Sequence, residues 1–220
     1  MSGRGGVDQQ KHWDGIVPPE CSSNPSILNL DPSLTWVEAQ EPLHKGIDGE
    51  ATIGPGMSFA NLVLAKKPGL GVLGLVPCAM GGTKISEWAR GTFLYNRMVT
   101  RAQAAVRGGG MIRAILWFQG ESDAITAEDA NNYKQRLEQF IQNVRSDLGS
   151  PTLPFIQVGI ATGLGPYKDA VRTAQFGVNL PNVKIVDAQG LPIMWDYTHI
   201  TTQGQVQLGH MLADTYLRNF

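Results

Sequence analysis

A regular alternation of helical and extended patterns downstream of residue 57 is the feature that most constrains the fold. Apolar residues recur at helical spacing in the segments 57–67, 93–107, 127–148, 167–179 and 203–220. Short apolar runs stand between them at 70–76, 112–118, 155–161 and 183–188. These runs are continuous rather than alternating, which indicates strands buried on both faces. The pattern predicts a three-layer α/β fold with a parallel sheet between helices.

Residues 7–56 break this pattern. They carry six prolines and few periodic apolar residues, so we expect a long ordered insertion there. Trp13 and Trp36 favour packing of the insertion onto the rest of the chain, although a surface decoration fits the same residues. A length of 220 residues suits one domain with a sizeable core. We therefore predict a single domain at 1–220.

Charge and hydropathy exclude several partner classes. Lys and Arg total 18 against 19 Asp and Glu, a net charge of −1, so we expect neither nucleic acid nor an anionic membrane as a partner. The longest apolar runs, 69–77 and 155–161, are far shorter than the roughly 20 residues of a membrane span, which predicts a soluble protein. The two cysteines, Cys21 and Cys78, favour a reducing compartment, and the cytoplasm is favoured over secretion.

Polar residues follow two of the predicted strands, where an open parallel α/β sheet gathers its reactive groups. In 76–83, the adjacent Gly81 and Gly82 fit either a backbone N–H donor to an oxyanion or a plain tight turn. In 117–123, Gln119 and Glu121 are candidate site residues with polar side chains, while Ser122 or Asp123 fits a helix N-cap.

A third polar group lies just before the last predicted helix, where Asp196 stands three residues ahead of His199. An acid at this spacing can hold the imidazole in the tautomer that a general base requires, although both residues also suit a plain surface loop. His12, His44 and His210 lack such a partner, and no His/Cys cluster has metal-ligand spacing. We expect no metal and no cofactor.

Four blocks of sequence occur in order at suitable separations: Gly3-Arg4-Gly5-Gly6-Val7, Gly82-Thr83 followed by Glu87-Trp88, Trp117-Phe118-Gln119-Gly120-Glu121-Ser122-Asp123, and Asp196-Tyr197-Thr198-His199. Together they resemble the sialate O-acetylesterase-type carbohydrate esterases of the SGNH hydrolase superfamily. Residues 41–60 and 201–209 resemble the plant branch of that family. The resemblance covers essentially the whole chain.

This resemblance implies a flavodoxin-like parallel sheet of strand order 2-1-3-4-5 and ester hydrolysis by a Ser-His-Asp mechanism. It makes His199 the general base and Asp196 the acid that orients it. Gly82 and Gln119 become the backbone and amide donors to the oxyanion, and Glu121 an outer carboxylate or an alternative partner for His199. The implied substrate is an acetyl ester of a small molecule or a polysaccharide.

The family's first block reads Gly-Gln-Ser-Asn-Met, and its Met aligns with Met1. We therefore expect the nucleophilic Ser and the first strand to lie upstream of residue 1 and to be absent from this chain. Ser2 matches the small residue after that Met and is not expected to replace the nucleophile. Because the first strand is central in this order, the strands at 70–76 and 112–118 are expected to lose their shared neighbour.

Three functions compete for this sequence. An ester hydrolase is the preferred one, with Trp88 and Trp195 as walls of its pocket because each flanks a site block. A non-catalytic carbohydrate-binding remnant that keeps the cleft and lacks the nucleophile is the alternative. A flavodoxin-type nucleotide binder is disfavoured, since no strand is followed by a G-x-G-x-x-G pattern at a helix start.

Overall fold

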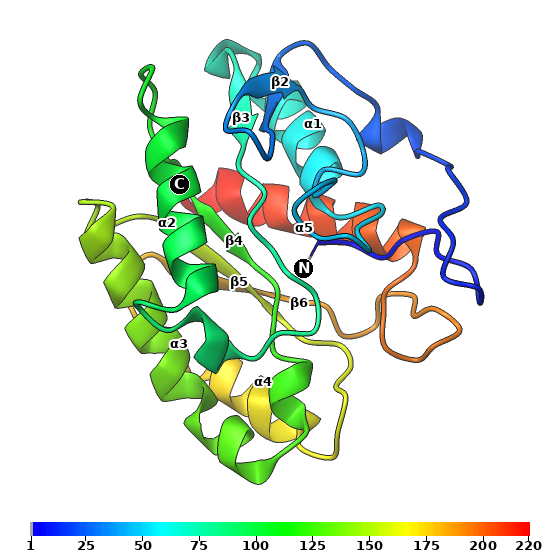
Figure 1. Ribbon diagram of the computed structural model, residues 1–220, viewed down its shortest axis with the longest axis vertical. Helices are drawn as coiled ribbons and strands as arrows, with labels where there is room; N and C mark the ends of the chain where they lie inside the picture. The colour runs from blue at the N-terminus through cyan, green and yellow to red at the C-terminus, as the bar shows by residue number, and fades with distance from the viewer. Residues whose placement is uncertain (1) are drawn as a thin grey trace. The chain divides into compact units, whose positions relative to one another are not determined.

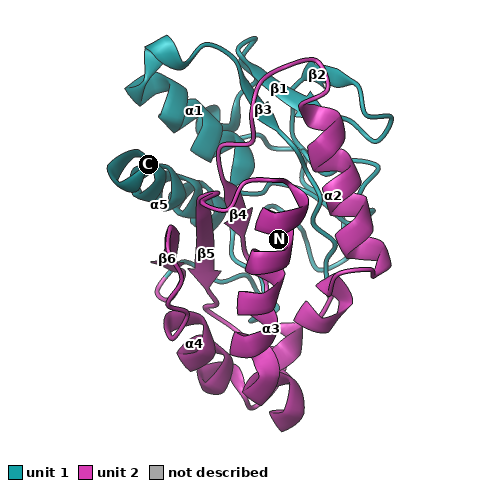
Figure 2. Ribbon diagram, turned by 90° about the vertical axis from the view of Figure 1, so that its left-hand side faces the viewer, with its two compact units in different colours: residues 1–81, 191–220 teal, residues 82–190 magenta. Residues whose placement is uncertain are grey.

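The computed structural model describes residues 2–220, whose helices and strands are shown in Figure 1. The described chain forms two compact units, coloured separately in Figure 2. Unit 1 combines the described residues up to Gly81 with Leu191–Phe220, and unit 2 is the continuous segment Gly82–Gly190. Whether the two units behave as the single domain expected from the sequence stays a prediction.

Unit 2 is built on a three-stranded parallel sheet. Its strands lie in the order β4 (Ile115–Trp117), β5 (Phe155–Gly159) and β6 (Val183–Asp187). Its helices are α2 (Phe93–Ala105), α3 (Ala127–Asp147) and α4 (Lys168–Phe176). The register sets Ile115 opposite Phe155, and Phe155 opposite Val183. The predicted α/β class with a parallel sheet is confirmed.

The core of unit 2 forms where α3 packs on this sheet. One face of α3 is buried along its length, through Tyr133, Leu137, Phe140, Ile141 and Val144. The ring of Phe140 lies 4.5 Å from that of Trp117 and 6.3 Å from that of Phe155, measured between centroids. All five residues of the central strand β5 are buried, as its apolar sequence predicts.

Unit 1 contains a second sheet and two helices. The strands lie in the order β2 (Trp36–Glu38), β1 (Ile27–Leu30) and β3 (Leu73–Leu75), with β1 antiparallel to β2 and parallel to β3. The helices α1 (Gly56–Lys66) and α5 (Thr202–Asn219) pack against each other. Short 3-10 helices lie at Pro19–Cys21 and Pro68–Leu70 in unit 1, and at Ile85–Trp88 and Ser122–Ala124 in unit 2.

The segment 7–56, predicted as a long ordered insertion without assigned strands, contributes strands β1 and β2. The strand predicted at 70–76 pairs with β1 in the sheet of unit 1, and only the other three predicted strands share the parallel sheet of unit 2. Strands of three and four residues between prolines are too short to show a period, which explains why the sequence pattern missed them. β3 and β4 are each an edge strand of their own sheet. The expected neighbour of both, a strand upstream of residue 1, stays a prediction.

Within residues 2–220, no helix combines the length and the apolar character that crossing a membrane requires.

Candidate active site

The loop at residues 193–200 forms a narrow turn just before α5. Ile193 pairs with Ile200 in an antiparallel bridge, and the amide of Met194 donates to the carbonyl of His199 at 2.7 Å. Tyr197 lies near the tip with φ of 56°, in the left-handed region that a bulky residue seldom adopts. Hydrogen bonds across the turn therefore define the backbone that carries the predicted acid and histidine.

The side chains of Asp196 and His199 meet within this turn. The Nδ1 atom of His199 lies 2.6 Å from Oδ2 of Asp196, a short hydrogen bond. The other carboxylate oxygen, Oδ1, accepts the backbone N–H groups of Thr198 and His199, each at 2.9 Å. A carboxylate at Nδ1 favours the tautomer that leaves the Nε2 lone pair free. The catalytic roles of both residues stay predictions.

The surroundings of Asp196 keep its carboxylate charged. Partial burial raises the pKa of Asp196, but hydrogen bonds from the His199 ring and from the amides of His199 and Thr198 outweigh that effect. The pKa of Asp196 therefore lies below its ordinary value. A charged acid at this position can stabilise a protonated imidazole.

The side chain of His199 is partly exposed. Its Nε2 has no hydrogen-bond partner among residues 2–220, and 36% of its side chain is exposed. Trp195 is 46% exposed, and its Nε1 donates to the carbonyl of Val7 at 3.2 Å, which anchors the ring. The other predicted wall, Trp88, is a buried core residue, with its ring edge-on to Trp117 at 5.3 Å between centroids.

The sequence analysis missed a buried polar cluster of Ser2, Arg4 and Asp48, which also binds the backbone amide of the exposed Gly81. The hydroxyl of Ser2 donates to Asp48 and accepts from Nη1 of Arg4 at 3.0 Å. Oδ2 of Asp48 also accepts the amide of Gly81 at 3.0 Å and Nη2 of Arg4 at 3.3 Å. Only 11% of the Arg4 side chain and 6% of the Asp48 side chain are exposed. Ser2 is thus engaged inside unit 1 by partners other than His199.

The charge of Asp48 is preserved despite its burial. Burial raises the pKa of Asp48, but the Ser2 hydroxyl, the amides of Glu50 and Gly81, and the charge of Arg4 together lower it below its ordinary value. In the sequence, only Arg4, a charged residue between two glycines of the first block, pointed to this cluster. The acid that pairs with Arg4 lies 44 residues further along the chain, where no pattern marks it.

Gly82 begins unit 2 in an exposed turn, with φ of 73°. Its N–H forms no hydrogen bond with any described residue, and open space lies where a Cβ atom would stand. A backbone donor that is accessible and unengaged suits the oxyanion role predicted for it. That role stays a prediction.

Gln119 is buried within unit 2, and both hydrogens of its amide are engaged. Its Nε2 donates to the carbonyl of Thr83 at 2.9 Å and to the carboxylate of Asp123. Its Oε1 accepts from the Tyr133 hydroxyl at 3.0 Å, and its main-chain carbonyl accepts from Nε2 of Gln175 at 2.9 Å. A side-chain amide has only two N–H donors, so none is spare in this arrangement. The predicted oxyanion role of Gln119 stays untested.

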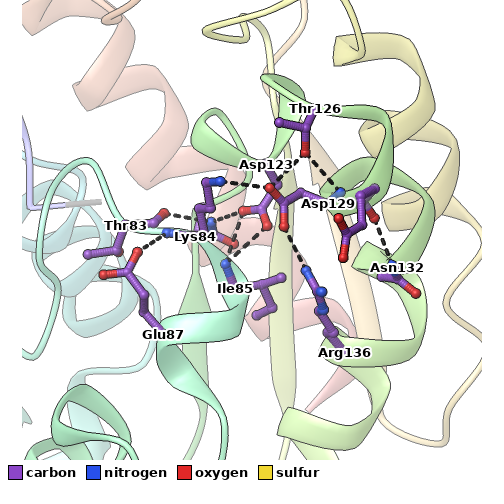
Figure 3. A network of polar contacts seen from close by, with 11 residues as sticks. Thr83, Lys84, Ile85, Glu87, Asp123, Thr126, Asp129, Asn132 and Arg136 are labelled. Carbon is purple, nitrogen blue, oxygen red and sulfur yellow. Dashed lines mark hydrogen bonds and ion pairs between the residues drawn. The ribbon is translucent and has the colours of Figure 1, made fainter.

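Asp123 is the residue of the third block that the sequence analysis misjudged. Neither Ser122 nor Asp123 caps α3; the cap is Thr126, whose hydroxyl accepts the amide of Asp129 at 3.2 Å. Asp123 is completely buried, and its two oxygens accept the amide of Ile85 at 3.0 and 3.2 Å (Figure 3). Burial raises the pKa of Asp123 to about 6, even though its hydrogen bonds lower it.

Glu121 lies in unit 2, where its main-chain carbonyl accepts the amide of Leu164 at 3.0 Å. Because Nδ1 of His199 is bonded to Asp196, the position that an alternative acid would take is filled.

Across residues 2–220, no group of three or more His, Cys, Asp or Glu side chains is arranged to hold a metal ion. The expectation of no metal and no cofactor stays a prediction.

Comparisons with known proteins extend over the whole chain. The family described as "Carbohydrate esterase, sialic acid-specific acetylesterase" matches residues 1–218. A probable carbohydrate esterase of Arabidopsis thaliana is 52% identical over 228 residues, which cover 100% of this chain and 87% of that protein.

Two solved structures show the same fold. An X-ray structure of an Arabidopsis thaliana protein has a TM-score of 0.96 at 52% identity, and the match covers 100% of this chain and 94% of that one. A carbohydrate acetylesterase from Xanthomonas citri has a TM-score of 0.64 at 21% identity, over 88% of this chain and 49% of that one.

Proposed function

Because this chain belongs to the carbohydrate esterase family of sialic acid-specific acetylesterases, we propose that it hydrolyses O-acetyl esters of carbohydrates. The observation that carries the proposal is the 2.6 Å hydrogen bond between His199 Nδ1 and Asp196, together with an Nε2 that no described residue engages. A histidine held in this way is the central part of a Ser-His-Asp ester hydrolase.

In this mechanism, Nε2 of His199 takes the proton of a serine hydroxyl while the serine oxygen attacks the acetyl carbonyl carbon. Negative charge moves to the carbonyl oxygen, and the role proposed for the Gly82 N–H is to stabilise that oxyanion. The protonated His199 then gives its proton to the departing sugar oxygen. Water attacks the acetyl-serine by the same route, which releases acetate and restores the hydroxyl.

The nucleophile of this mechanism is a serine hydroxyl at Nε2 of His199. Within unit 1, no described serine donates to His199, and the hydroxyl of Ser2 donates to Asp48. Exposed aromatic residues in the same turn as the histidine support a sugar as the substrate. Trp195 and Tyr197, which flank Asp196, are 46% and 86% exposed, and sugars stack on exposed aromatic faces.

The test compares four chains on p-nitrophenyl acetate and on a peracetylated xyloside: the unaltered chain, the same chain with Gly-Gln-Ser-Asn placed before Met1, that extended chain with alanine for the added serine, and His199→Ala in the extended chain. We expect hydrolysis by the extended chain and a loss of at least 1,000-fold, on the order of a missing triad member, in its two variants. Equal rates for all four chains would contradict the mechanism.

A non-catalytic carbohydrate-binding protein is the second candidate, and the engagement of the Ser2 hydroxyl by Asp48 is the observation that favours it. It predicts that all four chains bind the xyloside and release no acetate. Calorimetric titration run beside the acetate assay separates the two functions, because binding without turnover in the extended chain supports only the second.

A further inference from the structure

The N–H of Gly82 can act as an effective oxyanion donor only if the backbone on both sides holds it in one direction. On the preceding side, the amide of Gly81 is bonded to Asp48. Catalytic donors are effective because they are fixed before the reaction begins. Gly82 itself is exposed, has a φ of 73°, and has open space where a Cβ atom would stand. No residue of the described chain bonds to the Gly82 N–H, so we look to the neighbouring residues for the restraint.

The next three residues supply that restraint through hydrogen bonds to their main chain. The carbonyl of Thr83 accepts Nε2 of Gln119 at 2.9 Å, and the amide of Ile85 donates to both oxygens of Asp123 at 3.0 and 3.2 Å. Gln119 also donates to Asp123. The side chains of Gln119 and Asp123, which follow β4, therefore hold the backbone of segment 83–85 through hydrogen bonds. Asp123 bonds both to this segment and to Gln119.

Further contacts hold the same segment from its outer side, as Figure 3 shows for the charged ones. The amide of Lys84 donates to Glu87 at 2.7 Å, and Nζ of Lys84 lies 2.7 Å from Asp129. Asp129 is itself paired with Arg136 at 2.9 Å. These partners are partly exposed, whereas Asp123 is completely buried and has no solvent to replace a lost bond.

We propose that Asp123 is a positioning residue, which directs the Gly82 N–H by fixing Ile85 and Gln119 and, through them, the segment 83–85. The inference rests on the proposed function, because it assumes that Gly82 serves an oxyanion. Asp123 touches no substrate in this role. It acts only through the backbone that follows Gly82.

Asp123→Asn is the direct test, since it keeps the size of the side chain and exchanges one acceptor oxygen for a donor. In the ester-hydrolysing chain, we expect kcat to fall roughly 10- to 100-fold with KM within about twofold, as a displaced donor would cause. Amide hydrogen exchange at Ile85 should accelerate at least tenfold. Unchanged exchange, or an unchanged kcat with faster exchange, would overturn the proposal.

Asp147→Asn is the matched control. Asp147 also lies in unit 2 and accepts hydrogen bonds from Tyr95 and Arg90, but no bond joins it to residues 82–85 in the described chain. We expect its kcat and the exchange at Ile85 to match those of the unaltered protein. An equal fall of kcat in both variants would show a general loss of structure and would count against Asp123.

If Asp123→Asn fails to fold, a measurement on the unaltered protein tests the bond between Asp123 and the Ile85 amide, on which the proposal rests. The Ile85 amide proton and the carboxyl carbon of Asp123 should titrate together in NMR spectra. Lys84, Asp129, Arg136 and Tyr133 are ionisable groups that also act near Asp123. The carboxyl carbon of Asp129 is followed in the same spectra, so that its titration is told apart from that of Asp123. An Ile85 amide that titrates independently of Asp123 would refute the contact.

The two proposals can fail separately. If no chain hydrolyses an ester, the proposed function fails and the positioning role fails with it, while exchange and titration at Ile85 still report whether Asp123 holds the segment. If hydrolysis is found and Asp123→Asn retains full kcat, only the positioning role is lost.

Discussion

Asp196 uses its two carboxylate oxygens for different partners: Oδ2 holds the imidazole, and Oδ1 holds the turn through two backbone amides. In Asp196→Asn, the amide oxygen can keep the backbone bonds while Nδ2 faces Nδ1 of His199. The ring then has to accept at Nδ1 and carry its proton on Nε2. We expect kcat for ester hydrolysis to fall by roughly 1,000- to 10,000-fold with the fold unchanged.

The ¹⁵N chemical shifts of the His199 ring check this change of tautomer without any turnover. Asp14→Asn serves as the control, because Asp14 is a loop carboxylate of the same unit that bonds to the amide of Ile16 and makes no bond to His199. A ring tautomer that is the same in Asp196→Asn and in the unaltered protein would contradict the assignment.

Asp123 leads to a prediction about pH. Burial raises its pKa from 3.8 to about 6, so between these values the folded state holds a proton that the unfolded state has lost. Its contribution to stability is therefore full below about pH 3.8 and is lost as pH rises through about 6. A pKa difference of about 2 corresponds to roughly 3 kcal/mol.

We expect the stability advantage of the unaltered protein over Asp123→Asn to shrink by about 1–3 kcal/mol between about pH 4 and pH 7, as urea unfolding measures it. Carboxylates common to both proteins cancel in this difference. An advantage that grows with pH would show that Asp123 is ionised more readily in the folded state.

At the scale of elements, the contact between α1 and α5 depends on a glycine. A Cβ atom at Gly209 would collide with the hydroxyl of Ser58 and would lie 2.6 Å from the carbonyl of Pro55. We expect Gly209→Ala to lower the free energy of unfolding by about 1–3 kcal/mol, the usual cost of overpacking. Urea denaturation measures this loss.

The exposed Gln207 on the same helix provides the control, since Gln207→Ala adds no atom to the contact and should change stability by less than about 0.5 kcal/mol. Ser58→Ala should relieve Gly209→Ala only in part, because the main chain of Pro55 stays in the way. Full recovery in the double variant would mean that the side chain of Ser58 alone sets the spacing.

At the scale of the whole molecule, hydrogen bonds and an ion pair join the first described residues to distant segments of unit 1. The carbonyl of Val7 accepts Nε1 of Trp195, and the pair formed by Arg4 and Asp48 ties the first described residues to Gly81. Arg4→Met leaves Asp48 buried without a cation, so we expect a loss of roughly 3–5 kcal/mol. Thermal and urea unfolding both report it.

The double variant Arg4→Met/Asp48→Asn removes the uncompensated charge and should recover part of that loss. Asp169→Asn is the control, because its pair with Lys168 is 3.6 Å long and 91% of the Asp169 side chain is exposed. Its stability should change by less than about 0.5 kcal/mol. A double variant as unstable as the sum of its two single variants would show that the two charges do not interact.

The sequence by itself determined the features that depend on neighbouring residues. Helix α3 was expected at 127–148 and lies at Ala127–Asp147, because its apolar face repeats every three to four residues. The spacing of three residues made a bond between Asp196 and His199 possible, and the resemblance to the esterase family made it expected. Local spacing is written in the chain, so it can be read without knowing the fold.

The tertiary structure alone decided which distant segments meet. The pairing of β1 with β3, the pair of Arg4 and Asp48, and the grip of Asp123 on Ile85 join residues that lie 46, 44 and 38 positions apart. No periodic pattern marks such partners, because each is selected by the burial of a polar group that must find a hydrogen bond once the chain has folded around it. Asp123 therefore suited a helix cap in the sequence and became a buried acceptor in the structure.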